Sequence, residues 1–313
     1  MQAAPPRIVI TGAAGLVGQN LIVRLKRRGF SALVGIDKHA ANTKVLARLN
    51  PDMTVIEADL AREGGWEAGF AGAEVLVLAH AQIGGEDRTA FEANNIAATR
   101  NVLRAAEAAG ISYIVHLSSS VVNSAAHDFY TETKKAQEAL VAACSIPHVV
   151  LRPTLMFGWF DRKHLGWLAR FMRRAPLFPI PGNGRYRRQP LYVGDFCHII
   201  MACIERRGTG IYNISGLSEI DYIDLIRAVR DASGSRTRIL KIPFWLFGLL
   251  LRIYALIDRD PPFTTRQLAA LVIPELFEVI DWPSIFSVGA TPLTVALQET
   301  FQSKPYSDIA LAF

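Results

Sequence analysis

A tyrosine and a lysine four residues apart carry the clearest chemistry in this 313-residue chain. The segment Tyr130-Thr-Glu-Thr-Lys134 is predicted to be helical, and this spacing places both side chains on one helix face. A tyrosine with its ordinary pKa of about 10 is a poor base at neutral pH, but a nearby ammonium favours the phenolate. We therefore expect Lys134 to lower the pKa of Tyr130, which would exchange a proton with a substrate oxygen during hydride transfer.

Three consecutive serines, Ser118 to Ser120, follow the predicted strand Tyr113–Leu117. Ligands of open parallel sheets bind at the carboxyl ends of the strands. A serine hydroxyl at this position can hold the oxygen of a substrate, so the serines and the Tyr130/Lys134 pair are predicted to form one site.

Three glycines, Gly12, Gly15 and Gly18, lie between a predicted strand (Arg7–Thr11) and a predicted helix (16–28). The first permits a tight turn, the second lets the backbone approach a pyrophosphate, and the third allows the helix to pack against the sheet. The helix N-terminus favours the negative charge of the pyrophosphate. The spacing in this context predicts a dinucleotide-binding loop.

Asp37 follows the second predicted strand, about 20 residues beyond the glycines. A carboxylate there accepts hydrogen bonds from ribose hydroxyls and repels a 2′-phosphate, which favours NAD over NADP. The neighbouring Lys38 weakens this preference, so NADP stays the less favoured alternative.

The elements that must position these residues alternate between strand and helix. Strands are predicted at 7–11, 32–36, 54–57, 75–79, 113–117 and 148–151, with helices at 89–109 and 130–143 between the later ones. This order predicts an α/β fold with a doubly wound parallel sheet. The two helices are candidates for pairing across the two-fold axis of a homodimer.

The pattern changes after about residue 155. We predict a Rossmann domain over 1–155 and a smaller, interleaved substrate lobe over 156–313, with strands near 190–193 and 211–214 returning to the main sheet. The lobe is expected to contain a loop at 157–167, helices at 221–232 and 242–257, an irregular stretch at 281–290 and a last helix from Pro292.

The segment 242–257, IPFWLFGLLLRIYALI, is strongly apolar. It contains a proline and Arg252 and is shorter than the roughly 20 apolar residues of a spanning helix. We predict a helix buried in the second lobe. The alternative is a helix on a membrane surface, with Trp245 and Arg252 among the headgroups.

Charge and cysteine content bound the partners. The net charge is +6, and residues 151–313 carry the whole surplus, with 20 Lys/Arg against 14 Asp/Glu. This favours an anionic substrate such as a phosphate ester, and no basic run is typical of nucleic-acid binding. The three cysteines have no metal-ligand spacing, and no signal peptide begins the chain, so a cytoplasmic protein without a metal site is expected.

Five further stretches have the form of known motifs. They are Ala58-Asp59-Leu60, Asn95-Ile-Ala-Ala-Thr99, His116-Leu-Ser-Ser-Ser120, Leu151-Arg-Pro-Thr-Leu-Met-Phe-Gly158 and Arg188-Gln-Pro-Leu-Tyr-Val-Gly-Asp195. With the glycine loop and the Tyr130/Lys134 pair, they resemble the extended short-chain dehydrogenases, the NAD-dependent epimerase/dehydratase family that acts on nucleotide sugars. The resemblance covers Arg7 to Ile214 and extends more loosely to Phe301.

The resemblance implies roles for individual residues. Ser120, Tyr130 and Lys134 would be catalytic, and Ser119, Ser120, Arg185 and Arg188 would contact the substrate, with Arg188 on its diphosphate. The residues implied in cofactor binding are Gly12, Gly15, Leu16, Val17, Gly18, Asp37, Lys38, Asp59, Leu60, Ala79, Ala81, Asn95, Ser118, Tyr130, Lys134 and Pro153.

Three departures from the family pattern narrow the reaction. Only ten residues separate Ser120 from Tyr130, so a loop that often touches substrate is short. His80 replaces a small residue beside the cofactor and is expected to be a hydrogen-bonded structural histidine. Ser120 is followed by two valines instead of the Asp-Glu pair of the dehydratases, which ranks dehydration below epimerisation and simple redox.

The leading hypothesis is an NAD-dependent epimerase or oxidoreductase acting on a hydroxyl or keto group of a nucleotide sugar. A second hypothesis keeps the chemistry but takes a sterol-like alcohol or a lipid-linked sugar, because of the apolar segment 242–257. A third is a dinucleotide-binding protein without catalysis, against which the Tyr/Lys/Ser set argues.

Overall fold

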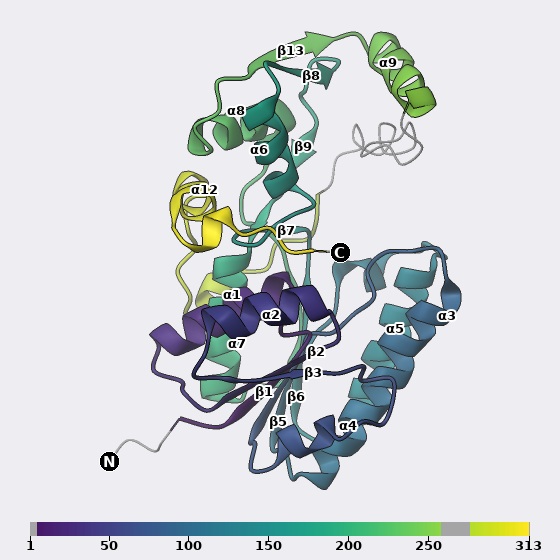
Figure 1. Ribbon diagram of the computed structural model, residues 1–313, viewed down its shortest axis with the longest axis vertical. Helices are drawn as coiled ribbons and strands as arrows, with labels where there is room; N and C mark the ends of the chain where they lie inside the picture. Colours follow the sequence, from purple (N-terminus) through teal and green to yellow (C-terminus); the bar gives the residue numbers. More distant parts are fainter. Residues whose placement is uncertain (1–4, 258–275, 313) are drawn as a thin grey trace.

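A seven-stranded parallel sheet forms the centre of the computed structural model, which describes residues 5–257 and 276–312 (Figure 1). The strand order is β11-β6-β5-β4-β1-β2-β3, so the chain runs outward from β1 in both directions. This confirms the predicted doubly wound fold. The strands are β1 (Ile8–Thr11), β2 (Leu33–Asp37), β3 (Thr54–Glu57), β4 (Val75–Leu78), β5 (Tyr113–Leu117), β6 (His148–Pro153) and β11 (Gly210–Ile214).

Helices cover both faces of the sheet (Figure 1). The central strands are buried on both sides, and successive residues alternate between two cores: Ile8 and Ile10 belong to one, Val9 to the other. One face carries α1 (Leu16–Arg27), α2 (Ala40–Leu49) and α7 (Val193–Arg206), and the other carries α3 (Arg88–Phe91), α4 (Ala98–Ala108) and α5 (Phe129–Ala142).

The helix predicted at 89–109 is interrupted by a π-helical segment, Glu92–Ala97, between α3 and α4. Asp87 caps α3 by accepting a hydrogen bond from the backbone N–H of Thr89 at 2.9 Å. The π segment turns Asn95 into the protein interior, where its side chain is fully buried. Such single-turn irregularities often occur near functional sites.

The strand predicted near 190–193 does not return to the main sheet. β10 (Leu191–Tyr192) pairs instead with β7 (Met156–Phe157), and the chain enters α7 at Val193. The apolar residues of α7 are buried because this helix packs between the sheet and α1, so its apolar run marked a buried helix and not a strand. The strand predicted at 211–214 is confirmed as β11, which pairs with β6.

The second lobe packs three helices against two small sheets. Its helices are α6 (Leu165–Arg174), α8 (Tyr222–Ala232) and α12 (Leu293–Gln302), and its strand pairs are β8 (Leu177–Pro181) with β13 (Arg238–Ile242) and β9 (Arg187–Arg188) with β12 (Ile220–Asp221). The helices at 221–232 and from Pro292 are confirmed. The stretch 281–290 contains a short helix, α11 (Trp282–Phe286), where an irregular segment was expected.

The segment 242–257 forms the predicted helix, α9 (Phe244–Ile257), but the prediction that it is buried is wrong. Trp245 is 71% exposed, and Leu249 and Leu250 are nearly half exposed. A high apolar content indicates that a segment is stabilised by contact with an apolar surface. It does not indicate that this surface belongs to the same lobe. No helix in the described ranges combines the length and apolar character that crossing a bilayer requires.

Candidate active site

The glycine loop follows β1 and is shaped by two close backbone approaches. Gly12 has φ of +67°, and a Cβ there would lie 2.7 Å from the carbonyl carbon of Ala79. A Cβ on Gly18 would lie 2.5 Å from the carbonyl oxygen of Ala13. Gly15 differs, because only one atom, the carbonyl oxygen of Gly12 at 3.3 Å, lies near its Cβ position. The protein itself therefore excludes side chains at 12 and 18, and the cofactor contact expected of Gly15 stays a prediction.

The N-terminus of α1 opens directly from this loop. No side chain caps it at Gly15, and its first turn contains no acidic residue. The first backbone N–H groups, including those of Leu16, Val17 and Gly18, point out of the helix end and favour an anion. These features fit the pyrophosphate of NAD.

Asp37 ends β2 beside the glycine loop. Its Oδ2 accepts a hydrogen bond from the N–H of Ala14 at 3.0 Å, and its Oδ1 accepts one from His39 at 2.9 Å. These bonds hold the carboxylate next to the phosphate loop with lone pairs left for ribose hydroxyls. Lys38 points elsewhere, because its Nζ donates to Oδ1 of Asn94 at 2.6 Å.

The predicted adenine contacts follow β3. Asp59 Oδ1 accepts from the N–H of Ala61 at 3.1 Å, and the carbonyl of Leu60 accepts from the side chain of Asn101 at 3.0 Å. Both bonds fix the turn that carries Asp59 and Leu60 at the carboxyl edge of the sheet. This placement is consistent with the turn forming one wall of a dinucleotide-binding site.

The end of β4 packs against the glycine loop. The backbone N–H of Ala79 donates to the carbonyl of Thr11, and Ala81 follows two residues later, partly exposed. Asn95 braces this loop: its Oδ1 accepts from the N–H of Gln82 at 2.6 Å, and its Nδ2 donates to Thr133 at 2.9 Å. Its side chain is fully buried and bonded to protein, so Asn95 positions this loop, and the cofactor contact expected of it stays a prediction.

Tyr130 and the serines meet where β5 ends and α5 begins. The side chain of Ser119 lies near enough to the Tyr130 hydroxyl to lower the pKa of Tyr130. Ser118 is buried and donates to Oε2 of Glu138 at 2.6 Å, so its hydroxyl is engaged with the protein. Ser120 begins a short 3₁₀ helix, Ser120–Asn123. The catalytic role expected of Ser120 stays a prediction, and Ser119 is the serine that acts on the pKa of Tyr130.

The pKa of Tyr130 is raised above its ordinary value, chiefly by burial, while the side chain of Ser119 lowers it and Asp128 raises it. The expectation that the ammonium of Lys134 lowers the pKa of Tyr130 is not met, because that ammonium bonds elsewhere. The neutral phenol is thus favoured, which suits proton donation to a carbonyl oxygen.

Lys134 is almost completely buried beneath the end of β5. Its Nζ donates to the carbonyl of Leu117 at 2.9 Å and to Oε1 of Gln137. Burial lowers the pKa of Lys134 to about 7, and the nearby charge of Glu138 opposes that shift. A lysine with this pKa changes charge readily when an anionic or hydroxyl-rich ligand arrives.

A chain of hydrogen bonds links Lys134 to the glycine loop. Gln137 donates to Thr99 at 2.9 Å, and the two ring nitrogens of His80 contact the hydroxyls of Thr99 (3.2 Å) and Thr11 (2.9 Å). Burial lowers the pKa of His80 to about 3, so the ring is neutral. His80 is therefore the hydrogen-bonded histidine that the sequence indicated.

Arg188 lies in the second lobe against two aromatic rings, those of Tyr186 and Tyr222, which stack on each other with their centres 5.4 Å apart. Its guanidinium carbon is 5.6 Å from the ring centre of Tyr186 and 5.8 Å from that of Tyr222. It lines a small pocket with Leu155, Met156 and Phe157, the residues that follow Pro153 at the end of β6. Arg188 therefore lies close to the carboxyl edge of the sheet. Arg185 is exposed and outside the residues that line this pocket.

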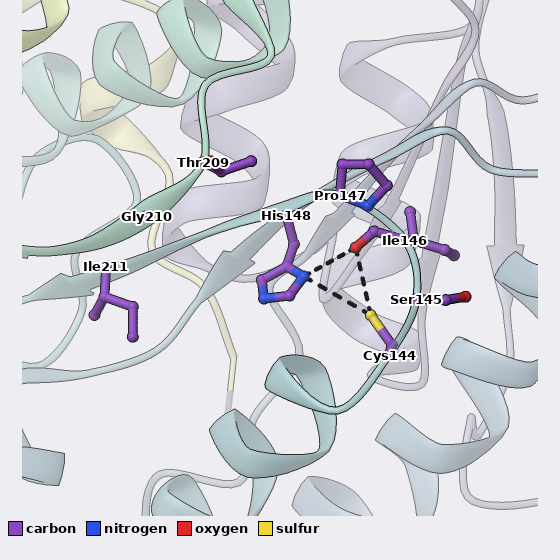
Figure 2. A pocket seen from close by; sticks show the side chains of 8 residues that line it. All are labelled: Cys144, Ser145, Ile146, Pro147, His148, Thr209, Gly210 and Ile211. Carbon is purple, nitrogen blue, oxygen red and sulfur yellow. Dashed lines mark hydrogen bonds between the residues drawn. The ribbon is translucent and has the colours of Figure 1, made fainter.

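A second hollow lies at the opposite edge of the sheet, where β6 and β11 begin (Figure 2). Cys144 and His148 line it, with Sγ and Nδ1 3.9 Å apart. Burial raises the pKa of the Cys144 thiol, so this pair lacks the thiolate that nucleophilic catalysis needs. In the described part of the chain, no three His, Cys, Asp or Glu side chains gather as metal ligands would.

Sequence reasoning missed the polar residues that support Lys134. Gln137 lies three residues beyond Lys134 on the same helix, and Glu138 lies four beyond it, so helical spacing carried a usable indication. Thr99, a residue of α4, accepts a hydrogen bond from Gln137. Spacing along the sequence could not indicate this contact.

Comparisons with known proteins agree with this arrangement. The sequence model of the NAD dependent epimerase/dehydratase family matches residues 8–215. Ceramide reductase of Caulobacter vibrioides is 22% identical over 96% of this chain and 88% of its own length, and UDP-glucose 4-epimerase of Vibrio cholerae is 23% identical over 82% and 85%. The Bordetella bronchiseptica enzyme WbmG, solved with NAD and UDP, superposes with a TM-score of 0.71 at 18% identity over 95% of this chain and 93% of that one. The glycine loop, the open end of α1 and Asp37 fit the cofactor that gives the family its name. The chain belongs to the NAD-dependent epimerase/dehydratase family.

Proposed function

We propose that this protein transfers a hydride to or from the carbon of a secondary alcohol or ketone, with Tyr130 as the acid/base. The observation that carries the proposal is the position of Tyr130 at the start of α5, where the side chain of Ser119, just beyond β5, is near enough to lower its pKa. The carboxyl edge of the sheet also carries the glycine loop and Asp37.

The residues divide the work at this site. Gly12, Gly15, Gly18 and the N-terminus of α1 would hold the pyrophosphate of NAD, and Asp37 the adenosine ribose. NAD, when bound, supplies or accepts the hydride. Ser119 orients the substrate oxygen toward Tyr130.

Proton transfer follows from the state of Tyr130. In the reducing direction, the neutral phenol donates its proton to the carbonyl oxygen as the carbon gains the hydride, and the phenolate then regains a proton from solvent. In the oxidising direction the phenolate must form first. Lys134, charged and turned toward the site by a bound ribose, is the group that would favour it.

The leading substrate class is a nucleotide sugar. Arg188 is a buried cation that lines a small pocket beside the end of β6, and a guanidinium matches the geometry of a diphosphate. The named relative UDP-glucose 4-epimerase supports this choice. Epimerisation requires the keto intermediate to be reduced on its other face, whereas a reductase stops after one transfer.

A second substrate class, a lipophilic ketone, is favoured by one observation. The pocket of Arg188 is walled mainly by apolar side chains, including Leu155, Phe157 and Leu225. The relative named ceramide reductase, similar along nearly the whole chain, supports this alternative.

A substrate panel with both cofactor states tests the proposal. Purified protein would be incubated with NAD or NADH and with UDP-sugars or long-chain ketones, while reduced nicotinamide is followed optically. Tightly retained NAD and interconversion of sugars without net cofactor use would identify an epimerase, whereas stoichiometric consumption of NADH would identify a reductase. No hydride transfer with any member of either class would contradict the proposal.

A further inference from the structure

An exposed apolar surface lies at the end of the second lobe, where β8, β13 and α9 meet (Figure 1). Its described members are Leu177, Leu240, Phe244, Trp245, Leu249 and Leu250, each between 39% and 71% exposed. We call these six residues the apolar tip. They belong together in space: β13 pairs with β8, and the ring of Phe244 lies against Gly182, just beyond β8.

Basic residues flank the apolar tip in the described part of the chain. Residues 173–184 contain two Lys/Arg, residues 232–250 contain three, and neither of these described ranges contains Asp or Glu. Arg173 and Arg174 end α6 shortly before β8, and Arg238 and Lys241 project from β13; all four are exposed. The tip therefore pairs exposed apolar and aromatic side chains with a positive rim, which these four residues form.

The combination of an apolar tip and a positive rim indicates what kind of partner covers this surface. A second copy of the same face would oppose one positive rim with another, which disfavours a symmetric dimer through the tip. A bilayer with anionic headgroups satisfies both features, because its interface takes up apolar and tryptophan side chains while its surface attracts Lys and Arg. We propose that the apolar tip docks the protein on the surface of an anionic lipid bilayer, without spanning it.

The depth of docking is set by charge as well as area. Arg238 precedes exposed Leu240 by two residues and Lys241 follows it by one, so their charged ends would stay among the headgroups while Leu240 enters the acyl boundary. Trp245, the most exposed member, would lie at the interface. The proposal is independent of the reaction assigned to Tyr130.

Vesicle co-sedimentation tests the docking. The full chain would be mixed with vesicles of pure phosphatidylcholine or of three parts phosphatidylcholine to one part phosphatidylglycerol. Binding is expected only to the mixed vesicles and should weaken at high ionic strength. The double variant Arg238→Gln/Lys241→Gln should bind about 25-fold more weakly, since each charge near an anionic surface contributes about fivefold. The variant Leu249→Glu/Leu250→Glu should lose at least about 100-fold.

A matched control removes the same charge elsewhere. Lys44 and Arg48 are exposed on α2 of the Rossmann domain, so Lys44→Gln/Arg48→Gln should bind vesicles like the wild type. NAD affinity and thermal unfolding of every variant would establish that each one is folded. Absence of wild-type binding to mixed vesicles, or equal loss in the α2 control, would overturn the proposal. So would a concentration-dependent dimer that Leu249→Glu/Leu250→Glu dissociates, because a second copy would then cover the tip.

Discussion

The side chain of Ser119, the middle of three consecutive serines, lies near the Tyr130 phenol and lowers its pKa. Ser119 is held in place at the start of a 3₁₀ helix, where its Oγ accepts from the N–H of Val121 at 3.4 Å. Ser118, one residue earlier, faces the opposite way toward Glu138. The alternation at the end of β5 thus selects one hydroxyl for the site.

Replacing these serines one at a time tests that selection. Ser119→Ala should lower kcat by about 100-fold or more, because the substrate oxygen loses a positioned partner. Ser120→Ala, the matched control, should change kcat by less than about threefold, since Ser120 makes no bond to Tyr130 in this arrangement. Steady-state kinetics on both variants decides the matter, and a larger loss in Ser120→Ala would reverse the assignment.

The two glycines at positions 15 and 18 should fail in different ways. Gly15→Ala should keep the fold, because the one near contact of its Cβ, 3.3 Å from the Gly12 carbonyl oxygen, needs only a small backbone shift, yet lose NAD affinity by at least about tenfold as the methyl group enters the ligand's space. Gly18→Ala should lower the melting temperature as well, since its Cβ would lie 2.5 Å from a backbone oxygen. Calorimetric titration and thermal melts separate the effects. Normal NAD binding by Gly15→Ala would contradict the placement of the pyrophosphate.

Burial of Lys134 makes stability depend on pH. Its pKa in the folded protein, about 7, lies below its ordinary 10.5, so the unfolded chain binds the extra proton between these values. The unfolding free energy of the protein without NAD should therefore rise with pH across this window, with a slope approaching about 1.4 kcal/mol per pH unit. Lys134→Met should lack this contribution.

Denaturant unfolding at a series of pH values measures that difference. Lys135→Met is the matched control, because Lys135 is exposed and contacts only the carbonyl of Ser124 among the bonds described for it. Its curve should parallel the wild type. Parallel curves for Lys134→Met and wild type would instead show that Lys134 titrates near its ordinary pKa.

His80 should stabilise the fold without changing its protonation state near neutral pH. His80→Ala removes one hydrogen-bond partner from each of the hydroxyls of Thr11 and Thr99 and leaves a cavity, and should cost about 2–4 kcal/mol. His80→Gln can bond both hydroxyls and should recover part of that loss. Because the ring is neutral, the pH–rate profile between roughly pH 5 and 8 should keep its shape in His80→Gln. A profile that loses an inflection in this range would contradict a neutral His80.

Much of the Rossmann domain was predictable because its strands are covered on both faces. Continuous apolar runs such as Val75–Leu78 have few alternatives to a buried parallel strand. The same logic failed for the strand predicted near 190–193, because β10 pairs with β7 outside the main sheet and the apolar run from Val193 belongs to a buried helix, α7. The prediction of burial failed at α9, where Phe244, Trp245, Leu249 and Leu250 are exposed.

The site was predictable where spacing has a geometric meaning. Gly12, Gly15 and Gly18 around a strand end, and Tyr130 with Lys134 on one helix face, follow from local geometry. The choice among Ser118, Ser119 and Ser120 depends on where β5 stops, and strand ends are uncertain by more than one residue from sequence. The roles of Asn95 and His80 depend on partners far apart in the chain, which no local pattern contains.

The most direct test of the account is hydride transfer by Tyr130→Phe. With the best substrate from the UDP-sugar and ketone panel, a single turnover should be followed by the absorbance of reduced nicotinamide, alongside calorimetric measurement of NAD affinity. Tyr130→Phe should bind NAD with an affinity within about twofold of wild type and transfer the hydride about 100- to 10,000-fold more slowly. Tyr212→Phe, which removes a hydroxyl bonded only to the exposed carbonyl of Thr209 among the described contacts, should leave the rate unchanged. An undiminished rate in Tyr130→Phe would show that Tyr130 is not the acid/base of the reaction.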